Sequence, residues 1–177
     1  DGKFRPRELE PGELAASFTT WQDALAQAGW NSLYLANHDQ PRPVSRFGDV
    51  TAWWRESATA LATVLHLQRG TPYVYQGEEL GMTNAPFDQI GDYRDVESLN
   101  HFTDAVGRGE QPDAVIAGLL RMSRDHARTP VQWDDSLNAG FTTGTPWIRV
   151  NPNHTRVNAV SQYDDPGSVF EHYRALI

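Results

Sequence analysis

Two short apolar runs, each preceded by an amphipathic helical pattern, constrain the fold of this chain more than any other feature. Residues 32–36 and 71–75 are largely apolar, as is typical of parallel strands buried on both faces. The helix expected before the first run ends at Gly29, and its apolar stripe consists of Leu14, Phe18, Trp21 and Leu25. The helix before the second run ends at Gly70, and its stripe consists of Trp54, Ala58, Leu61 and Leu65. Helix, strand, helix, strand in this order predicts an α/β fold with β-α-β packing.

The rest of the chain is predicted to be mostly loop. Residues 77–112 and 129–164 are rich in Gly, Asp, Asn and Pro, with one helix expected between them at residues 114–126. A last helix should begin at Asp165 as N-cap and Pro166 as its first residue. The sequence opens without an initiator Met and closes inside this helix, so we expect a piece of a longer protein.

Composition excludes several classes of protein. The 177 residues are 39% hydrophobic, which suffices for one folded domain. A formal net charge of −8 is the wrong sign for nucleic-acid binding, and the lack of cysteine excludes disulfides and thiolate metal sites. No apolar run approaches the roughly 18 residues of a membrane span. The prediction is a soluble, cytoplasmic protein that binds neither nucleic acid nor membranes.

Polar clusters follow both predicted strands. Residues 37–39 read Asn-His-Asp, and residues 76–79 read Gln-Gly-Glu-Glu. In α/β barrels the C-terminal ends of the strands carry the active site, so both clusters are expected at the same mouth. Taken alone, the first could be a turn and the second a helix cap, but together they favour a functional site.

Other site types find little support in the sequence. It contains no nucleophile elbow, zinc-binding helix, phosphate loop or dinucleotide fingerprint, and its histidines lack ligand spacing. The acids at 88, 92, 95 and 97 lack the spacing of a calcium loop, which predicts a solvated acidic loop. Trp21 and Trp54 lie on helical stripes and are expected in the core. Trp133 and Trp147 lie in loops, where they could serve as sugar platforms.

Three longer segments resemble one known family. Residues 31–49 read NSLYLANHDQPRPVSRFGD and residues 73–82 read YVYQGEELGM. Residues 124–134 read RDHARTPVQWD, followed by NAGF at 138–141 and Pro-Trp at 146–147. Together they resemble the α-amylase superfamily, glycoside hydrolase family thirteen, and in particular its oligo-1,6-glucosidase and α-glucosidase branch. The resemblance covers nearly the whole chain, in order.

This resemblance implies a partial (β/α)8 TIM barrel. Residues 31–36 would be strand seven, 52–69 helix seven, 71–75 strand eight, and the helix from Asp165 helix eight, with long loops after strand eight and helix six at the start. Residues 1–177 would then be one incomplete domain, the C-terminal part of a catalytic barrel, because a complete barrel typically needs about 250 residues.

The resemblance also implies roles for individual residues. Asp39 is similar to the family's third acid, which stabilises the transition state, whereas the nucleophile and the acid/base lie on earlier strands outside this chain. His38 and Arg128 resemble residues that bind the sugar. Arg42 and Glu78 match the motifs too and are expected to have structural roles, as an ion pair or loop anchor, and Arg124 is expected to hold its loop.

The implied activity is that of a retaining α-glucosidase acting on short oligosaccharides, in a parent enzyme whose remaining barrel strands this fragment needs. Sucrose or trehalose isomerases and glucosyltransferases share these motifs, so transfer stays open beside hydrolysis, as does α-1,4 beside α-1,6 linkage. A non-catalytic barrel relative and a stand-alone carbohydrate-binding module are further alternatives. No metal or cofactor is expected in this chain; the family resemblance leaves room for a structural calcium in the preceding part of the barrel.

Overall fold

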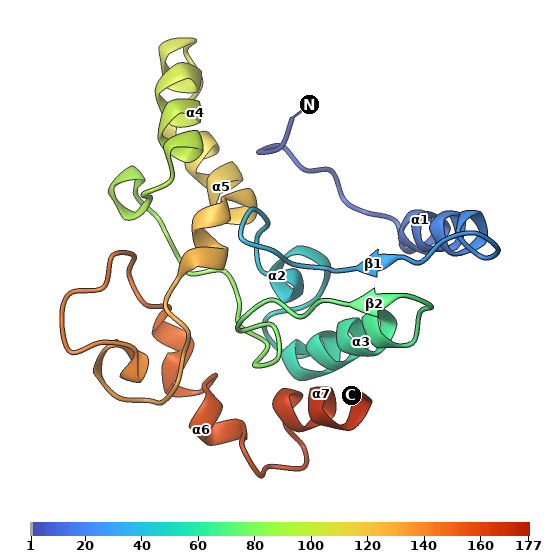
Figure 1. Cartoon of the computed structure of the whole chain (residues 1–177). Coiled ribbons are helices and arrows are strands. Elements are labelled where there is room, and N and C mark those ends of the chain that lie inside the picture. The colour runs from blue at the N-terminus through green and yellow to red at the C-terminus, as the bar shows by residue number, and fades with distance from the viewer. Residues whose placement is uncertain (1) are drawn as a thin grey trace.

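The computed structural model describes residues 2–177, and this part of the chain is mostly helical. Its α-helices are α1 (Pro11–Ala24), α2 (Pro43–Phe47), α3 (Trp54–His66), α4 (Val96–Gly107), α5 (Pro112–Met122), α6 (Ala159–Gln162) and α7 (Val169–Leu176). The strands are β1 (Ser32–Leu33) and β2 (Thr71–Pro72), and the 3₁₀ helices are η1 (Ile90–Asp92), η2 (Arg124–Arg128), η3 (Leu137–Gly140) and η4 (Pro152–Thr155). Figure 1 shows the two strands near the middle of the molecule, with α4 extending away from them.

The strands β1 and β2 pair in parallel and are joined through α3. Ser32 lies opposite Thr71 and Leu33 opposite Pro72. The backbone amide of Thr71 donates to the carbonyl of Asn31 at 2.8 Å, and the amide of Tyr73 donates to that of Leu33 at the same distance. The predicted order of helix, strand, helix, strand is therefore confirmed, although each strand has only two paired residues.

The expectation that both faces of the strands are buried is wrong. Leu33 and Leu35 are buried and pack with Leu65 of α3, whereas Tyr34 and Tyr73 are 55% and 57% exposed. Side chains alternate between the two faces of a strand, so the leucines face α3 and Tyr34 faces the opposite side.

The largest cluster of buried residues lies around α4 and α5. Leu119 of α5, Phe87, Tyr93 and Ile148 are its central members, and Phe4 from the N-terminal segment joins it. A second cluster lies between α3 and α7, where Ala58 and Ala62 contact Val169 and Tyr173. A further cluster joins Leu80 and Met82, from the loop after β2, to Val131.

Several predicted boundaries need correction. The structure contains α4 where a loop was expected, because Leu99, Phe102 and Val106 recur at helical spacing within polar surroundings. Helix α1 ends at Ala24 rather than Gly29. The last helix begins three residues later than predicted, since the side chain of Ser168, not Asp165, accepts the capping hydrogen bond from the Glu171 amide.

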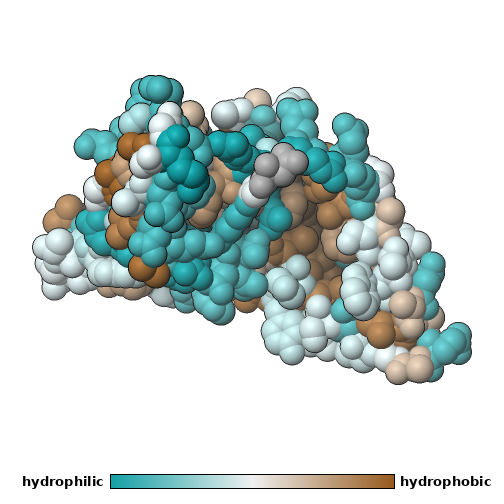
Figure 2. Space-filling view, turned by 90° about the horizontal axis from the view of Figure 1, so that it is seen from above, coloured by the Kyte–Doolittle hydropathy of each residue, from teal (hydrophilic) through white to brown (hydrophobic). Residues whose placement is uncertain are grey.

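The first helix is also less buried than its stripe predicts. Trp21 is 58% exposed, and α1 has no fully buried residue. Its apolar side lines a groove of about 610 Å³ that it shares with β1. Figure 2 shows a hollow in one face of the molecule with hydrophobic residues on its floor. None of the helices within residues 2–177 is long and apolar enough to cross a lipid bilayer.

Candidate functional site

The segment after β1 forms a tight turn that sets the direction of Asp39. The Asn37 side-chain oxygen accepts a 2.8 Å hydrogen bond from the Asp39 amide, and the Asn37 carbonyl accepts one from the Gln40 amide. An Asn side chain that bonds the backbone two residues later replaces one bond of a regular turn. The predicted turn is therefore present, and it presents His38 and Asp39 at the surface.

The helix η2 brings two arginines to this turn. Ser123 caps η2, because its hydroxyl accepts from the Asp125 amide at 3.1 Å. The buried Asp125 carboxylate in turn accepts hydrogen bonds from the amides of Arg94 and Asp95. The start of α4 and the start of η2 are thereby fixed to each other, with Arg124 and Arg128 on the side that faces Asp39.

Four side chains form a ring of ion pairs. Asp39 Oδ1 accepts from Arg124 Nη1 and from Arg128 Nη2, both at 3.0 Å. Asp95 Oδ2 accepts from Arg124 Nε at 2.8 Å, and its Oδ1 accepts from Arg128 Nη1 at 3.0 Å. We call these four residues, Asp39, Asp95, Arg124 and Arg128, the ion-pair ring. Two carboxylates and two guanidiniums make it neutral overall.

His38 completes the exposed side of the ring. Its Nε2 lies 3.2 Å from Asp39 Oδ2, and its backbone carbonyl accepts from Arg128 Nε at 3.1 Å. The side chains of His38 and Asp39 are 71% and 43% exposed, whereas that of Asp95 is only 4% exposed. The ring thus has an open end at Asp39 and a buried end at Asp95.

The arginines keep Asp39 ionised. Desolvation raises the pKa of its carboxyl, but the hydrogen bond from Arg124 and the nearby positive charges outweigh this and hold the pKa below its usual value. The result is a carboxylate with one oxygen, Oδ2, that no arginine contacts. Together with imidazole and guanidinium donors, such an oxygen can bind a ligand with several hydroxyl groups and stabilise a developing positive charge.

Arg42 lies away from this open site and is buried. Its Nε donates to the carbonyl of His126, its Nη1 to that of Gln76, and its Nη2 to the hydroxyl of Thr129. Burial lowers the pKa of Arg42 to about 10, so it stays charged at neutral pH. Its contacts join the loops after β1, β2 and η2, which is the geometry of a loop anchor, and within residues 2–177 it forms no ion pair.

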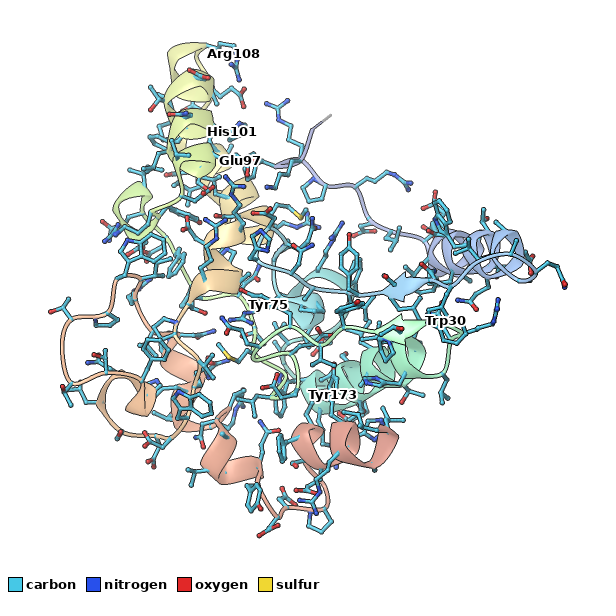
Figure 3. The ribbon with its side chains drawn as sticks, viewed as in Figure 1. Trp30, Tyr75, Glu97, His101, Arg108 and Tyr173 are labelled. Carbon is cyan, nitrogen blue, oxygen red and sulfur yellow. The ribbon has the colours of Figure 1, made fainter. Side chains whose placement is uncertain are left out.

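Glu78 also faces inward. Its Oε1 accepts from the Tyr173 hydroxyl and its Oε2 from the Tyr75 amide, both at 3.2 Å. Figure 3 labels both tyrosines, Tyr75 after β2 and Tyr173 on α7 beneath α3. Burial raises the pKa of Glu78 to about 7. The polar clusters at residues 37–39 and 76–79, which were both predicted at the mouth of the barrel, therefore differ in exposure. Asp39 is open to solvent, whereas Glu78 is buried against α7.

The sequence interpretation missed one member of the ring. Asp95 belongs to the acidic stretch that was expected to be solvated, and its burial makes that expectation wrong for this residue. A signal was present, because Asp95 stands directly before the apolar spacing of α4, as an N-cap would. No group of His, Asp and Glu side chains within residues 2–177 is arranged to hold a metal ion.

The two loop tryptophans lie at the surface. Trp133 is 51% exposed and Trp147 is 63% exposed. Trp147 lines an open pocket of about 460 Å³ together with Arg94, Arg149 and His154. Arg94 precedes Asp95 in the chain, so this pocket lies near the start of α4.

Comparison with known proteins gives a consistent result over the whole chain. The family described as the alpha amylase catalytic domain matches residues 2–177. The oligo-1,6-glucosidase of Parageobacillus thermoglucosidasius is 54% identical over 99% of this chain and 32% of its own length. A trehalose-6-phosphate hydrolase of Bacillus subtilis is 51% identical over 93% of this chain and 30% of its own length. The chain therefore spans about a third of the curated relatives that it matches.

Solved structures of related proteins have the same fold as this chain over nearly its whole length. Trehalose-6-phosphate hydrolase of Bacillus licheniformis superposes with a TM-score of 0.94 at 47% identity, covering 98% of this chain and 32% of that one. A variant of isomaltulose synthase from Erwinia rhapontici, crystallised with its natural substrate sucrose, has a TM-score of 0.94 at 43% identity, covering 98% of this chain and 31% of that one.

Proposed function

Because this chain belongs to the family of α-amylase catalytic domains, we propose that it is the C-terminal part of a (β/α)8 barrel in a retaining α-glucosidase. In this proposal β1 and β2 are strands seven and eight, and residues 1–177 form one incomplete domain. The parallel pairing through α3 and the exposed side of the strands support it, because further strands and their helices would cover that side.

The observation that carries the proposal is the geometry of Asp39. Both arginines bind its Oδ1, which leaves Oδ2 beside His38 at the open end of the ring. A retaining glycosidase passes through an oxocarbenium-like transition state, in which positive charge develops on the sugar ring. A fixed carboxylate in hydrogen-bonding reach of the sugar hydroxyls stabilises that state more than the ground state.

Each residue of the site has its own role in this proposal. Asp39 accepts hydrogen bonds from the sugar hydroxyls and stabilises the developing charge, while His38 and Arg128 donate to the same sugar. The nucleophile and the acid/base come from earlier strands of the longer polypeptide, about 5 to 5.5 Å apart as retention requires. Arg42 and Glu78 fix the loops behind the site, as their inward-facing contacts suggest.

Short α-linked oligosaccharides are the proposed substrates. The relatives include oligo-1,6-glucosidases and trehalose-6-phosphate hydrolases, all of which are glycoside hydrolases. The second candidate is isomerisation or glucosyl transfer, and the similarity to an isomaltulose synthase bound to sucrose favours it as the alternative.

The test is the reaction of the full-length protein that contains these residues. Incubated with isomaltose, maltose and sucrose, it should release glucose, and proton NMR should detect the α-anomer first. The Asp39→Asn variant is the control for the site. First release of β-glucose, or no reaction with any α-glucoside, would contradict the proposal. If sucrose gave a new disaccharide and no free glucose, the result would favour isomerisation or glucosyl transfer over hydrolysis.

A further inference from the structure

Asp95 is the buried member of the ion-pair ring, and its position differs from that of an ordinary helix cap. It is the N-cap residue of α4, a place where an Asp side chain normally accepts a hydrogen bond from the helix backbone. Its carboxylate makes no such bond. Both of its oxygens are used instead by arginines, Oδ2 by Arg124 and Oδ1 by Arg128.

The charges of the ring explain why a second carboxylate is needed. Arg124 and Arg128 both bind one oxygen of Asp39, so their guanidinium groups lie close together and repel each other. Without Asp95, the two arginines would share the single carboxylate of Asp39 within the ring, and the remaining three side chains would carry a net positive charge. Asp95 lies on the other side of both guanidiniums and neutralises that charge.

The geometry also limits where the guanidiniums can point. Each arginine is held at two atoms by two different carboxylates, a fork-like arrangement that fixes the plane of the group as well as its position. The anchor is rigid, because the Asp95 amide is bonded to the buried Asp125. Glu97 lies two residues further along the chain, in the first turn of α4, and of the two arginines its carboxylate reaches only Arg124, whose Nε is 3.5 Å away.

We propose that Asp95 is a positioning residue of the active site, which holds Arg124 and Arg128 on Oδ1 of Asp39 so that Oδ2 stays directed toward the sugar. The inference rests on the proposed function. It assigns a role to a residue that acts through the two arginines and, by way of them, on Asp39.

The test compares variants of the full-length protein on p-nitrophenyl α-glucoside. Asp95→Asn keeps the shape and the capping preference of the side chain but removes its charge. We expect kcat to fall on the order of 10- to 100-fold, with a smaller change in KM, because the interactions affected are strongest in the transition state. Asp104→Asn is the matched control: it makes the same change at an exposed position of α4 that forms no ion pair, and it should leave kcat unchanged.

A second variant separates positioning from simple loss of stability. Asp95→Ala leaves a space the size of a carboxylate between two arginines, and added formate should fill it and restore part of kcat. Formate should not affect Asp104→Ala. If misfolding alone reduced activity, kcat per folded molecule would be normal in both Asp95 variants, and formate would have no effect.

The outcomes distinguish the two proposals. If Asp39→Asn loses activity while Asp95→Asn behaves like Asp104→Asn, the positioning role is wrong and the proposed function stands. If the wild-type protein cleaves no α-glucoside, or Asp39→Asn retains full kcat, the proposed function fails and the role of Asp95 fails with it. A kcat loss in Asp95→Asn with formate rescue of Asp95→Ala supports both.

Discussion

Asp39 derives its proposed role from an uneven distribution of partners between its two oxygens. Oδ1 receives two guanidinium groups, whereas Oδ2 lies 3.2 Å from the imidazole of an exposed histidine. A single carboxylate is thereby both fixed in place and available to a ligand. This asymmetry arises from two segments that are far apart in the sequence, residues 38–39 and 124–128, and none of the local patterns reveals it.

Replacing the Asp39 carboxylate should therefore affect the rate more than binding. In the full-length protein, Asp39→Asn should lower kcat on the order of 10² to 10³-fold, because a hydrogen bond to a charged group contributes a few kcal/mol and this one strengthens in the transition state. Steady-state kinetics with p-nitrophenyl α-glucoside measures this. A raised KM with an unchanged kcat would mean that Asp39 only binds the ground state.

Glu78 makes the stability of the protein depend on pH. Burial raises its folded pKa to about 7 from a reference value of 4.5, so the folded state favours the protonated form. The resulting stabilisation is fully present below pH 4.5 and is lost as the pH rises through 7, at up to about 1.4 kcal/mol per pH unit.

Glu78→Gln mimics the protonated form and should remove this dependence. The variant should gain stability relative to wild type between pH 5 and pH 8, as measured by urea unfolding of the full-length protein at each pH. His126 has the opposite trend, since burial lowers its pKa to about 4, but it is present in both proteins and cancels in the difference. Parallel stability curves would show that Glu78 is already ionised in the folded protein.

At the scale of elements, helix α5 is held against the N-terminal segment by a close approach at Gly118. A Cβ added there would overlap the backbone carbonyl oxygen of Phe4, whose side chain belongs to the main buried cluster. A Cβ added at Gly107, at the end of α4, would meet only open space. The two glycines therefore differ in packing, although both lie in helices.

This difference predicts opposite effects of one substitution. Gly118→Ala should destabilise the protein by about 1 to 3 kcal/mol, because the N-terminal segment must shift. Gly107→Ala should be neutral or stabilising by up to about 1 kcal/mol, because alanine favours the helix. Melting temperatures of both variants in the full-length protein test this, and equal shifts would mean that residues 2–10 do not pack on α5 in solution.

Periodicity located most elements but not the site. The stripe of α3 and the run of β1 were recognisable because their apolar spacing is regular over many residues. Helix α4 was missed because Gly and Asp dominate its surroundings and its stripe is short. The ring was not predictable, since a local pattern cannot tell whether the Asp95 carboxylate caps a helix or binds an arginine from η2.

At the scale of the whole molecule, the exposed side of the strands is the main irregularity. Tyr34 and Tyr73 directly follow β1 and β2. Trp30 precedes β1 at the outer end of the same strand pair (Figure 3), and its Nε1 donates to the Thr71 hydroxyl. All three are more than half exposed. In addition, each strand has an edge that no strand of residues 2–177 pairs with.

Unpaired strand edges beside exposed aromatic side chains promote association. The isolated 177 residues should therefore self-associate in a concentration-dependent manner or remain partly molten, and sedimentation velocity over a range of concentrations measures this. Adding the remainder of the longer polypeptide should suppress the association. A monomer at all concentrations with sharp, cooperative unfolding would show that the chain is a stable domain by itself.

The central claim is that these residues supply the sugar-binding carboxylate of an α-glucosidase while the nucleophile and the acid/base lie elsewhere. Its most direct test is the turnover of p-nitrophenyl α-glucoside by the isolated residues 1–177, compared with a matched Asp39→Ala variant. The account predicts no difference between the two, because binding groups without a nucleophile and an acid leave the glycosidic bond essentially uncatalysed. Turnover well above the variant would contradict it, and would mean that Asp39 and Glu78 act as the catalytic pair.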